Sequence, residues 1–550
     1  MVDENIKNEL EEWMKNAKKV GNVYNVRGSR YSLNEVPITI EKGKEIPNWS
    51  YVFVKHWKTR NPVVFQIIDV YFDQHGAEYQ DVSISMGSPI KDPSMRKYKC
   101  RGLIVGEIEE NGDIIPPRYP IEPEADVYLC PDDMVEFVTQ PLDEWSIRIG
   151  EIPELRIPVK IQLEQLVRQG LLITGAQGTG KTTALITLIV RAALANPPLR
   201  FLILDWTGEF KAVSKGLYKE LAKEEEIKGG SKGEDEIKES VEKLVKVIDW
   251  WKIYCGLFTI EEMRAFCEKF LIGVVSFIAS GKQAVQNCLA QAIKSAIKSG
   301  RLTIERIREE IDNTGSKGFT KMQAEALVDI DMEDIIPSED YFEKWSELGV
   351  PLDDVINIVR EKRVIIIDFS SKPDEIRVPE DVETKARIAT AIAKKIWEVG
   401  SYDPKFGCII VIDEAHRVCP EKDFGYMDLI WQRLASEGGR NKIPLWIVAR
   451  RLSLVSKKVT TELQQNFFCF NVEDVDRKRV EEDLGKSFAS IAPYGTIPTL
   501  HCIIKSNGFK IPGQVVFTKV DVIERPAGAR LSKDVFEEMG EEREARGKRE

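Results

Sequence analysis

The glycine-rich segment GAQGTGKTT, residues 175–183, carries the clearest chemical signal in the sequence. Its spacing fits G-x-x-x-x-G-K-[ST], in which glycines let successive backbone N–H groups point at phosphates. Lys181 would place a positive charge near the β- and γ-phosphates, and Thr182 would offer a hydroxyl to Mg²⁺. The segment follows an apolar run and opens a helical pattern, which is the context that the motif requires. We therefore predict an ATP site that contains Gly175, Ala176, Gln177, Gly178, Thr179, Gly180, Lys181, Thr182 and Thr183.

Two acidic pairs follow apolar runs further along the chain. In CIIVIDEAH, Asp413 could hold the water shell of Mg²⁺, and Glu414 beside it could orient or deprotonate the attacking water. In LILDWTGEF, Asp205 and Glu209 stand at the carboxyl end of a predicted strand, where open α/β sheets place their ligands. We predict that this second pair also serves the nucleotide site. The alternative interpretation is that Asp205 caps a helix and Glu209 lies on the surface.

These residues need a scaffold, and the surrounding pattern predicts a RecA-like α/β core. Short apolar runs separated by helical patterns indicate a parallel sheet covered on both faces. The runs are GLLIT, LRFLILDW, KRVIIIDFS, GCIIVIDEA and IPLWIVARR. About 150 residues separate the second run from the third, too many for an ordinary connection. Helical patterns in VEKLVKVIDWW, EEMRAFCEKFLIGVVSFI and AVQNCLAQAIKSAIKSG indicate a helical insertion there.

The first 150 residues follow a different pattern, typical of a small β-barrel. Short alternating or apolar runs such as YVFVKHW, PVVFQIIDVYF, RGLIVGEIEE and ADVYLC are bounded by turn residues. The predicted domains are the barrel (1–150), the core (151–215 and 360–525), the helical insertion (216–359) and a charged carboxyl-terminal tail (526–550).

Composition narrows the class of protein. The 550 residues are 43% hydrophobic and 30% charged, a balance typical of globular proteins. No run of about 18 apolar residues occurs and the amino terminus lacks a signal-peptide pattern, so we expect a cytoplasmic protein with no membrane association. Nine cysteines without a C-x-x-C pair and four histidines favour buried thiols over structural zinc. The net charge of −11 leaves room for a local nucleic-acid channel.

The order of these motifs resembles the HerA/FtsK group of ring-forming P-loop DNA translocases, nearest its archaeal HerA branch. The resemblance covers the chain from about Ile157 to Asn471, and RGLIVGEIEENGDIIPPRYPIEPEADVYLC is similar to the barrel that precedes such motors. It implies an ATP-driven homohexamer that translocates or unwinds double-stranded DNA without sequence specificity. It also implies a role in DNA repair by end resection, with a NurA-type nuclease docked on the barrel.

The resemblance also implies roles for two arginines. Arg440, in SEGGRN, lies where the group presents an arginine finger to the neighbouring subunit's nucleotide; its alternative is a cap on the preceding helix. The group generally has Ser-Gln-Arg-Pro after its last core strand, where this chain has VARRLS. Arg450 could replace the γ-phosphate-sensing Gln, or the two arginines there could simply be solvated. A second departure is DWTGEF, which stands where the group usually reads D-P-H-G-E-Y.

DNA contacts are the least specified part of the sequence. Lys442, Lys457 and Lys458 lie on loops that border the predicted core strands, and phosphate contacts suffice for a motor that reads no sequence. The alternative interpretation is that these lysines are solvated surface residues. The basic segment RKYKCR, residues 96–101, could equally be an exposed strand edge.

Two other functions fit the same motifs. A plasmid- or virus-borne packaging or conjugation motor would share the core, and the departures DWTGEF and VARRLS give it mild support. A non-translocating switch NTPase or a defence-associated ATPase of the HerA type is the third hypothesis. Stimulation of ATP hydrolysis by DNA separates the two motors from the third.

Overall fold

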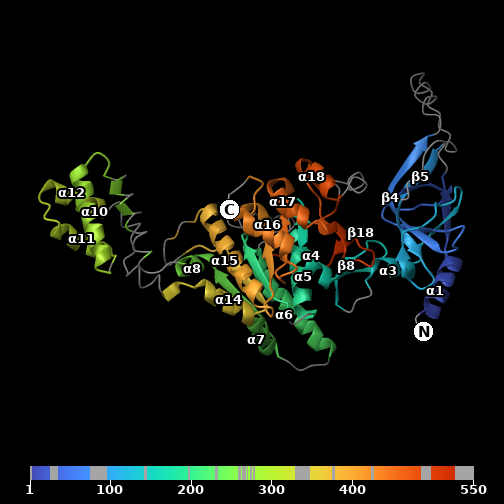
Figure 1. The fold of residues 1–550 in the computed structure, drawn as a ribbon, viewed down its shortest axis with the longest axis horizontal. Helices are drawn as coiled ribbons and strands as arrows, with labels where there is room; N and C mark the ends of the chain where they lie inside the picture. Colours follow the sequence, from blue (N-terminus) through green and yellow to red (C-terminus); the bar gives the residue numbers. More distant parts are fainter. Residues whose placement is uncertain are drawn as a thin grey trace, which may run out of the picture. The chain divides into compact units, whose positions relative to one another are not determined.

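The chain forms two compact units in a computed structural model (Figure 1). The first comprises residues 1–196 and 446–525, and the second comprises residues 197–445 and 526–550. The structure describes residues 3–24, 35–74, 96–141, 145–195, 199–228, 233–257, 262, 268, 271–272, 275–276, 279–300, 302–328, 347–373, 378, 380–422, 427–484 and 497–526. The carboxyl-terminal tail beyond residue 526 and most of EEMRAFCEKFLIGVVSFI, residues 261–278, lie outside these ranges.

The amino-terminal part of the first unit is a closed six-stranded antiparallel barrel. The order of its strands is β2-β1-β7-β3-β4-β5, and β5 pairs back with β2 to close the ring. Its elements are helix α1 (Asp3–Asn16) and strands β1 (Lys19–Val23), β2 (Glu35–Ile40), β3 (Tyr51–Lys55), β4 (Pro62–Gln74), β5 (Arg96–Ile108) and β7 (Asp126–Leu129), with β6 (Ile114–Ile115) beside β5. The predicted barrel is therefore confirmed.

Alternating side chains fill the barrel interior. Val52, Val54, Phe65 and Ile67 are all at most 1% exposed and pack in one core, because successive residues of a strand face opposite sides of the sheet. The register of β4 on β5 shifts twice, and such bulges increase the twist that closure requires.

A mixed sheet and its helices complete the first unit. The order of the strands is β15-β10-β16-β17-β18-β8-β9; β10 runs parallel to β15 and β16, and the pairings from β16 to β9 are antiparallel. The strands are β8 (Ser146–Glu151), β9 (Pro158–Gln162), β10 (Leu171–Thr174), β15 (Leu445–Ala449), β16 (Asn466–Cys469), β17 (His501–Ser506) and β18 (Gln514–Val520). The helices are α3 (Asp132–Thr139), α4 (Leu163–Gln169), α5 (Lys181–Ala195), α17 (Lys457–Glu462) and α18 (Asp474–Leu484).

The second unit contains four parallel strands in the order β12-β13-β11-β14. Every residue of β11, β13 and β14 is buried, as their continuous apolar sequences predict. The strands are β11 (Phe201–Asp205), β12 (Val245–Asp249), β13 (Val364–Asp368) and β14 (Ile409–Ile412). The helices are α6 (Ala212–Ile227), α7 (Glu234–Leu244), α8 (Trp250–Gly256), α14 (Leu352–Glu361), α15 (Val382–Tyr402) and α16 (Met427–Glu437). The RecA-like α/β fold is thus confirmed.

One expected helix is partly a strand. The sequence pattern predicts a helix through VEKLVKVIDWW, but residues 245–249 form β12 and pair in parallel with β13. Three of these five residues are β-branched, and pairing with a neighbouring strand overrides a local helical pattern.

Within the predicted insertion, residues 216–359, the segment from 283 to 327 contains three helices, whereas 245–249 is the strand β12. Helices α10 (Gln283–Lys298), α11 (Ile304–Asn313) and α12 (Phe319–Leu327) pack against one another (Figure 1). No helix within the described ranges is long and apolar enough to cross a bilayer. The eight cysteines in the described part of the chain are all buried and free of disulfides.

Candidate nucleotide site

The phosphate loop joins β10 to α5 and turns on glycines. The φ angle is +75° at Gly178 and +111° at Gly180, values that other residues adopt only with strain. A Cβ on Gly180 would lie 2.9 Å from Leu500 Cδ2, and one on Gly175 would lie 2.6 Å from Phe470 Cβ. Backbone conformation and crowding therefore both require glycine in this loop.

Two segments that are distant in sequence hold the loop. The backbone N–H of Ala176 donates to the Asn471 carbonyl (2.6 Å), and that of Leu500 donates to the Thr179 carbonyl (2.9 Å). Inside the loop, the Thr179 hydroxyl donates to the Ala176 carbonyl (2.9 Å). Sequence reasoning missed Asn471 and Leu500. They act through backbone groups, so no side-chain motif marks them.

The predicted phosphate-binding side chains lie at the amino end of α5. Lys181 is 9% exposed, and its Nζ donates to the Ala176 carbonyl at 2.7 Å. Thr182 is partly exposed, and its hydroxyl makes no hydrogen bond with the described residues. Thr183 is buried. Gln177 is exposed on the loop. A buried ammonium and free N–H groups at a helix amino terminus fit the phosphates of a nucleotide.

The two acids of CIIVIDEAH follow β14 in the second unit. Asp413 is 4% exposed. Glu414 adopts a left-handed backbone conformation with φ at +53°, and its carboxylate lies 3.2 Å from His416 Nδ1. A non-glycine residue in this conformation costs about 1–3 kcal/mol, and such strain clusters at functional sites. At this turn the side chain of Asp413 is buried, whereas that of Glu414 is partly exposed.

The DWTGEF loop folds around the carboxylate of Asp205. Asp205 Oδ1 accepts hydrogen bonds from the N–H groups of Thr207 (3.1 Å) and Gly208 (2.8 Å), and Oδ2 accepts one from Phe210 N–H (3.0 Å). Burial raises the pKa of Asp205, and these three backbone donors oppose the rise. The side chain of Glu209 is partly exposed and makes no hydrogen bond or ion pair with the described residues. Asp205 therefore organises the loop that presents Glu209.

Thr207 connects this loop to the acid on the next strand. Its hydroxyl lies 2.8 Å from Asp413 Oδ2 and 3.2 Å from Asp205 Oδ1, and its single proton favours the shorter contact. Burial raises the pKa of Asp413 to about 7; the Thr207 hydroxyl opposes the rise, and the neighbouring carboxylates of Asp205, Glu414 and Glu209 add to it. Mg²⁺ prefers such oxygen ligands, but among the described residues no group of three or more Asp, Glu, His or Cys side chains could hold a metal ion by itself.

Aspartates end all four parallel strands of the second unit. Asp249, Asp368 and Asp205 share one register position on β12, β13 and β11, and Asp413 follows β14 directly. The side chain of Asp368 is fully buried, and its Oδ2 lies 2.7 Å from Lys211 Nζ. Burial tends to raise the pKa of Asp368, but the Lys211 ammonium and the Ser370 hydroxyl outweigh burial and hold it below its usual value.

Lys211 directly follows DWTGEF, so this ion pair links the loop to Asp368 at the end of β13. Sequence reasoning missed it, although KRVIIIDFS and LILDWTGEF both carry an Asp at the strand end. The repeated placement was an available signal, because the carboxyl ends of parallel strands lie at one edge of a sheet.

The two predicted arginines are both exposed. Arg440 is exposed in the turn after α16, where its backbone N–H donates to the Glu437 carbonyl (3.1 Å). Arg450 is exposed directly after β15 and makes no ion pair with the described residues, whereas Arg451 pairs with Glu473 (3.1 Å). Both predicted arginines therefore present their side chains to solvent within their own unit.

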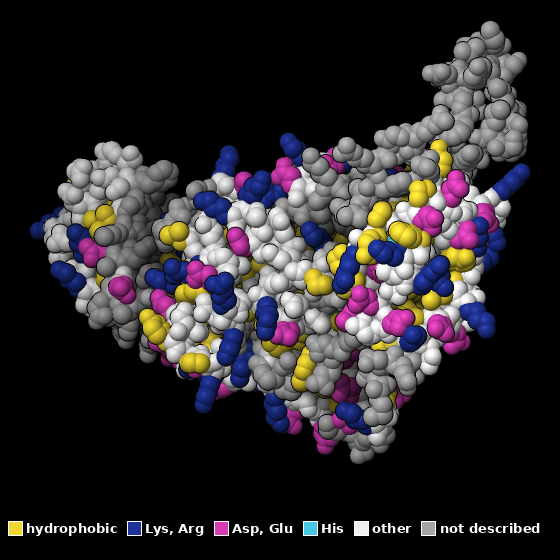
Figure 2. Space-filling model, turned by 45° about the vertical axis from the view of Figure 1, so that its right-hand side comes forward, with side chains coloured by type: hydrophobic (Ala, Val, Ile, Leu, Met, Phe, Trp, Pro, Cys, Tyr) yellow, Lys and Arg dark blue, Asp and Glu magenta, His cyan; other side chains and the backbone are white. Residues whose placement is uncertain are grey.

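The predicted DNA-contacting lysines differ in the interactions that they make. Lys442 Nζ donates to the Pro404 carbonyl (2.6 Å), and Lys457 pairs with Glu482 (3.2 Å). Lys457 and Lys458 begin helix α17 and do not lie on a loop as expected; Lys458 is exposed and unpaired within the described ranges. On the face drawn in Figure 2, basic and acidic side chains are interspersed rather than gathered by sign. RKYKCR begins β5, and Lys99 is 5% exposed over the Tyr24 ring.

The glycine loop, its buried lysine and the α/β sheet define a P-loop ATPase. Residues 147–396 match the family model for the central domain of helicase HerA. This segment includes the phosphate loop and the DWTGEF loop but ends before Asp413. This match covers less than half of the chain and supports the predicted resemblance to the HerA/FtsK-type group of P-loop ATPases. The chain's place in the archaeal branch stays a prediction.

Solved structures show only distant likeness. VirB4 of Thermoanaerobacter pseudethanolicus is 11% identical, with 72% of this chain and 100% of that chain covered and a TM-score of 0.36. The bacterial conjugative coupling protein TrwBdeltaN70 is 13% identical, with 73% and 94% covered and a TM-score of 0.35. The genome packaging NTPase B204 from Sulfolobus turreted icosahedral virus 2, in complex with AMP, is 14% identical, with 32% and 77% covered and a TM-score of 0.22. No curated protein matches the chain.

Proposed function

We propose that this ATPase is a homohexameric motor that translocates or unwinds double-stranded DNA. The observation that carries the proposal is the match of residues 147–396 to the HerA central domain, which contains both the phosphate loop and the DWTGEF loop. A motor of this kind contacts phosphates and reads no sequence.

Each predicted residue has a role in this proposal. Lys181 would neutralise the phosphate charge, and Glu414 would orient the attacking water and accept its proton. Thr182 and Asp413 would hold Mg²⁺, the latter through water, and the ion would neutralise charge on the phosphates. Asp205 would keep Glu209 in place through the loop that it organises.

Arg440 and Arg450 would stabilise charge that develops on the transferred phosphoryl group. In the hexamer, Arg440 would reach the nucleotide of the neighbouring subunit, and Arg450 would sense the γ-phosphate of its own. Exposure of both side chains supports roles that need an approaching partner or ligand.

The biological setting that we propose is DNA end resection and repair in the cytoplasm, beside a NurA-type nuclease that docks on the amino-terminal barrel. A conjugation or packaging motor is the second candidate, favoured by Trp206 and Thr207 of DWTGEF and by the missing Gln in VARRLS. Co-purification with a nuclease encoded by an adjacent gene would separate the two.

The first experiment is the ATPase rate with and without duplex DNA, together with the mass of the assembly. The Lys181→Ala chain is the control for contaminating hydrolysis. We expect a six-subunit mass, a rate raised severalfold by DNA, and DNA affinity that falls steeply with salt. A rate that DNA leaves unchanged would identify a switch ATPase instead of a motor.

A further inference from the structure

Two aromatic rings of the barrel are exposed to solvent, one in a turn and one in a loop. Trp57, in the turn between β3 and β4, is 47% exposed, and Tyr119, in the loop before β7, is 36% exposed. Both are large aromatic residues, which normally bury most of their surface.

Buried His56 holds this turn rigidly. Its Nδ1 accepts hydrogen bonds from the N–H groups of Lys58 (3.2 Å) and Thr59 (3.3 Å), so the proton lies on Nε2, which faces the Tyr119 carbonyl at 3.4 Å. Trp57 Nε1 donates to the Pro120 carbonyl at 3.2 Å, and the indole stacks on the His56 ring. The exposed indole is therefore fixed in place.

Four cations lie on the same two segments as the rings. Lys55, Lys58, Arg60 and Arg118 are exposed, and none forms an ion pair with a described residue. Lys58 Nζ lies 3.7 Å from the centre of the Tyr119 ring. This local excess of positive charge contrasts with the net charge of −11 for the whole chain.

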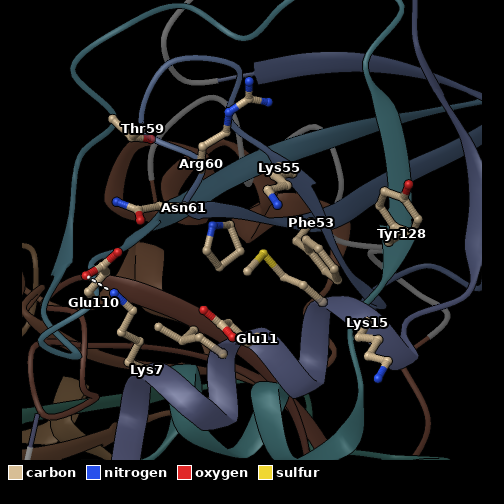
Figure 3. A pocket seen from close by; sticks show the side chains of 13 residues that line it. Lys7, Glu11, Lys15, Phe53, Lys55, Thr59, Arg60, Asn61, Glu110 and Tyr128 are labelled. Atoms are coloured by element: carbon tan, nitrogen blue, oxygen red, sulfur yellow. Dashed lines mark hydrogen bonds and ion pairs between the residues drawn. The ribbon is translucent and has the colours of Figure 1, made fainter. Parts of the chain in front are cut away.

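The same turn forms one wall of a cavity of about 470 Å³ between helix α1 and the outer face of the barrel (Figure 3). Lys55, Thr59, Arg60 and Asn61 line it, and the ammonium of Lys55 points toward its middle. On the opposite side, Lys7 of α1 pairs with Glu110 (2.9 Å), and Glu11 and Lys15 of α1 also line the cavity, so its lining holds four cations and two carboxylates. The volume is in the range of small-ligand sites, and Trp57 and Tyr119 are not among the residues that line the cavity.

We infer that this surface, formed by residues 55–61 and 118–119, binds single-stranded DNA. Rigid exposed rings suit unpaired bases, because every base has a face that can stack, and the cations on the same segments suit the phosphates. Bases in a duplex are already stacked on one another, and an acidic peptide needs the cations but not the rings. The binding requires no ATP hydrolysis, so it goes beyond the proposed motor and can be tested apart from it.

The test compares two fluorescent twelve-nucleotide probes, oligo-dT and an abasic strand of the same charge, on the full chain without ATP. Stacking predicts that wild type binds oligo-dT about tenfold or more tightly than the abasic strand. In the double variant Trp57→Ala/Tyr119→Ala, affinity for oligo-dT should fall to that for the abasic strand. Lys55→Ala/Arg60→Ala should weaken binding of both probes and reduce their salt dependence.

Trp145→Ala is the matched control, because Trp145 is also 47% exposed and lies outside the barrel strands. It should leave the preference for bases unchanged. Lys457→Ala/Lys458→Ala removes the lysines assigned to the motor's own DNA contacts, so their effect on both probes separates the two surfaces.

Three results would overturn the inference. One is equal affinity of wild type for both probes. Another is a base preference that survives Trp57→Ala/Tyr119→Ala while circular dichroism shows a folded chain. The third is displacement of oligo-dT by an oligo-glutamate of equal charge as readily as by unlabelled oligo-dT, since that would identify a site for acidic peptides.

Discussion

Replacing Thr207 with valine would remove a hydroxyl that joins two strand ends while keeping the branched shape of the side chain. In the native chain this hydroxyl donates to Asp413 Oδ2 at 2.8 Å, and its own backbone N–H donates to Asp205 Oδ1 at 3.1 Å. The variant keeps the second bond and loses the first. Asp413 is 4% exposed, so water replaces the lost donor poorly.

The expected loss follows from the burial of the acceptor, which is only partly ionised near neutral pH because burial raises its pKa to about 7. A hydrogen bond to a charged group contributes about 1.5–3 kcal/mol to stability, and leaving a buried acceptor unsatisfied costs a similar amount. Thr207 itself is exposed, which permits some rehydration, so we expect about 1–2 kcal/mol, the lower part of the ~1–3 kcal/mol that an unsatisfied buried acceptor costs. For units of about 150–250 residues each kcal/mol lowers Tm by about 2–4 °C, and the second unit is slightly larger, so we expect a fall of at most about 2–8 °C.

Thr207→Ser is the matched control, since it keeps the hydroxyl and loses only a methyl group. Calorimetric melting should show a lower Tm for Thr207→Val and a nearly native Tm for Thr207→Ser. Because the bond fixes the loop against Asp413, ATP turnover should fall about tenfold in the valine variant, with the KM for ATP little changed. Equal melting and turnover in the two variants would refute a role for the hydroxyl bond.

Three other substitutions test the predicted catalytic residues. Lys181→Ala should abolish hydrolysis, because the loop loses its cation, and near-normal turnover would remove the P-loop assignment. Glu414→Gln should keep ATP binding, measured with a fluorescent analogue, and cut turnover about a hundredfold or more; lost binding would instead make Glu414 structural and point to Glu209 as the base. Arg440→Ala should be inactive alone but partly active in rings mixed with Lys181→Ala subunits, since an arginine finger contributes about 10³ or more in rate. Mixed rings without recovery would exclude a finger that acts between subunits.

The strands and the phosphate loop could be predicted because their requirements are local. A strand buried on both faces needs a continuous apolar sequence, as in Val364–Asp368. The phosphate loop needs glycine where a side chain would collide, as at Gly180. Both requirements act on consecutive residues, so they are visible in one sequence.

Other parts could not be predicted because they depend on contacts between distant segments. Leu500 holds the phosphate loop through a backbone N–H, which every residue except proline possesses. Asp368 reaches Lys211 across 157 positions of sequence, and β12 forms only because β13 offers it a partner. Such contacts follow no period of 2 or 3.6 residues and leave no local pattern.

The structure also gives a physical reason why DWTGEF can depart from the usual D-P-H-G-E-Y. The positions that agree are set by the backbone: Asp205 accepts three N–H groups of the loop, and Gly208 has φ at +77° with a Cβ position only 2.6 Å from Ser370 Oγ.

The positions that differ are set by side-chain neighbours particular to this chain. Trp206 stacks on Phe369 with ring centres 4.6 Å apart, and the Arg417 guanidinium lies 5.4 Å from the indole centre. Thr207 contributes the hydroxyl bond to Asp413. Because Trp206 and Thr207 make contacts of their own while the loop backbone keeps its anchor at Asp205, the altered sequence indicates a repacked loop and not a lost site. The departure therefore weighs less against a working ATPase than the motif comparison alone implies.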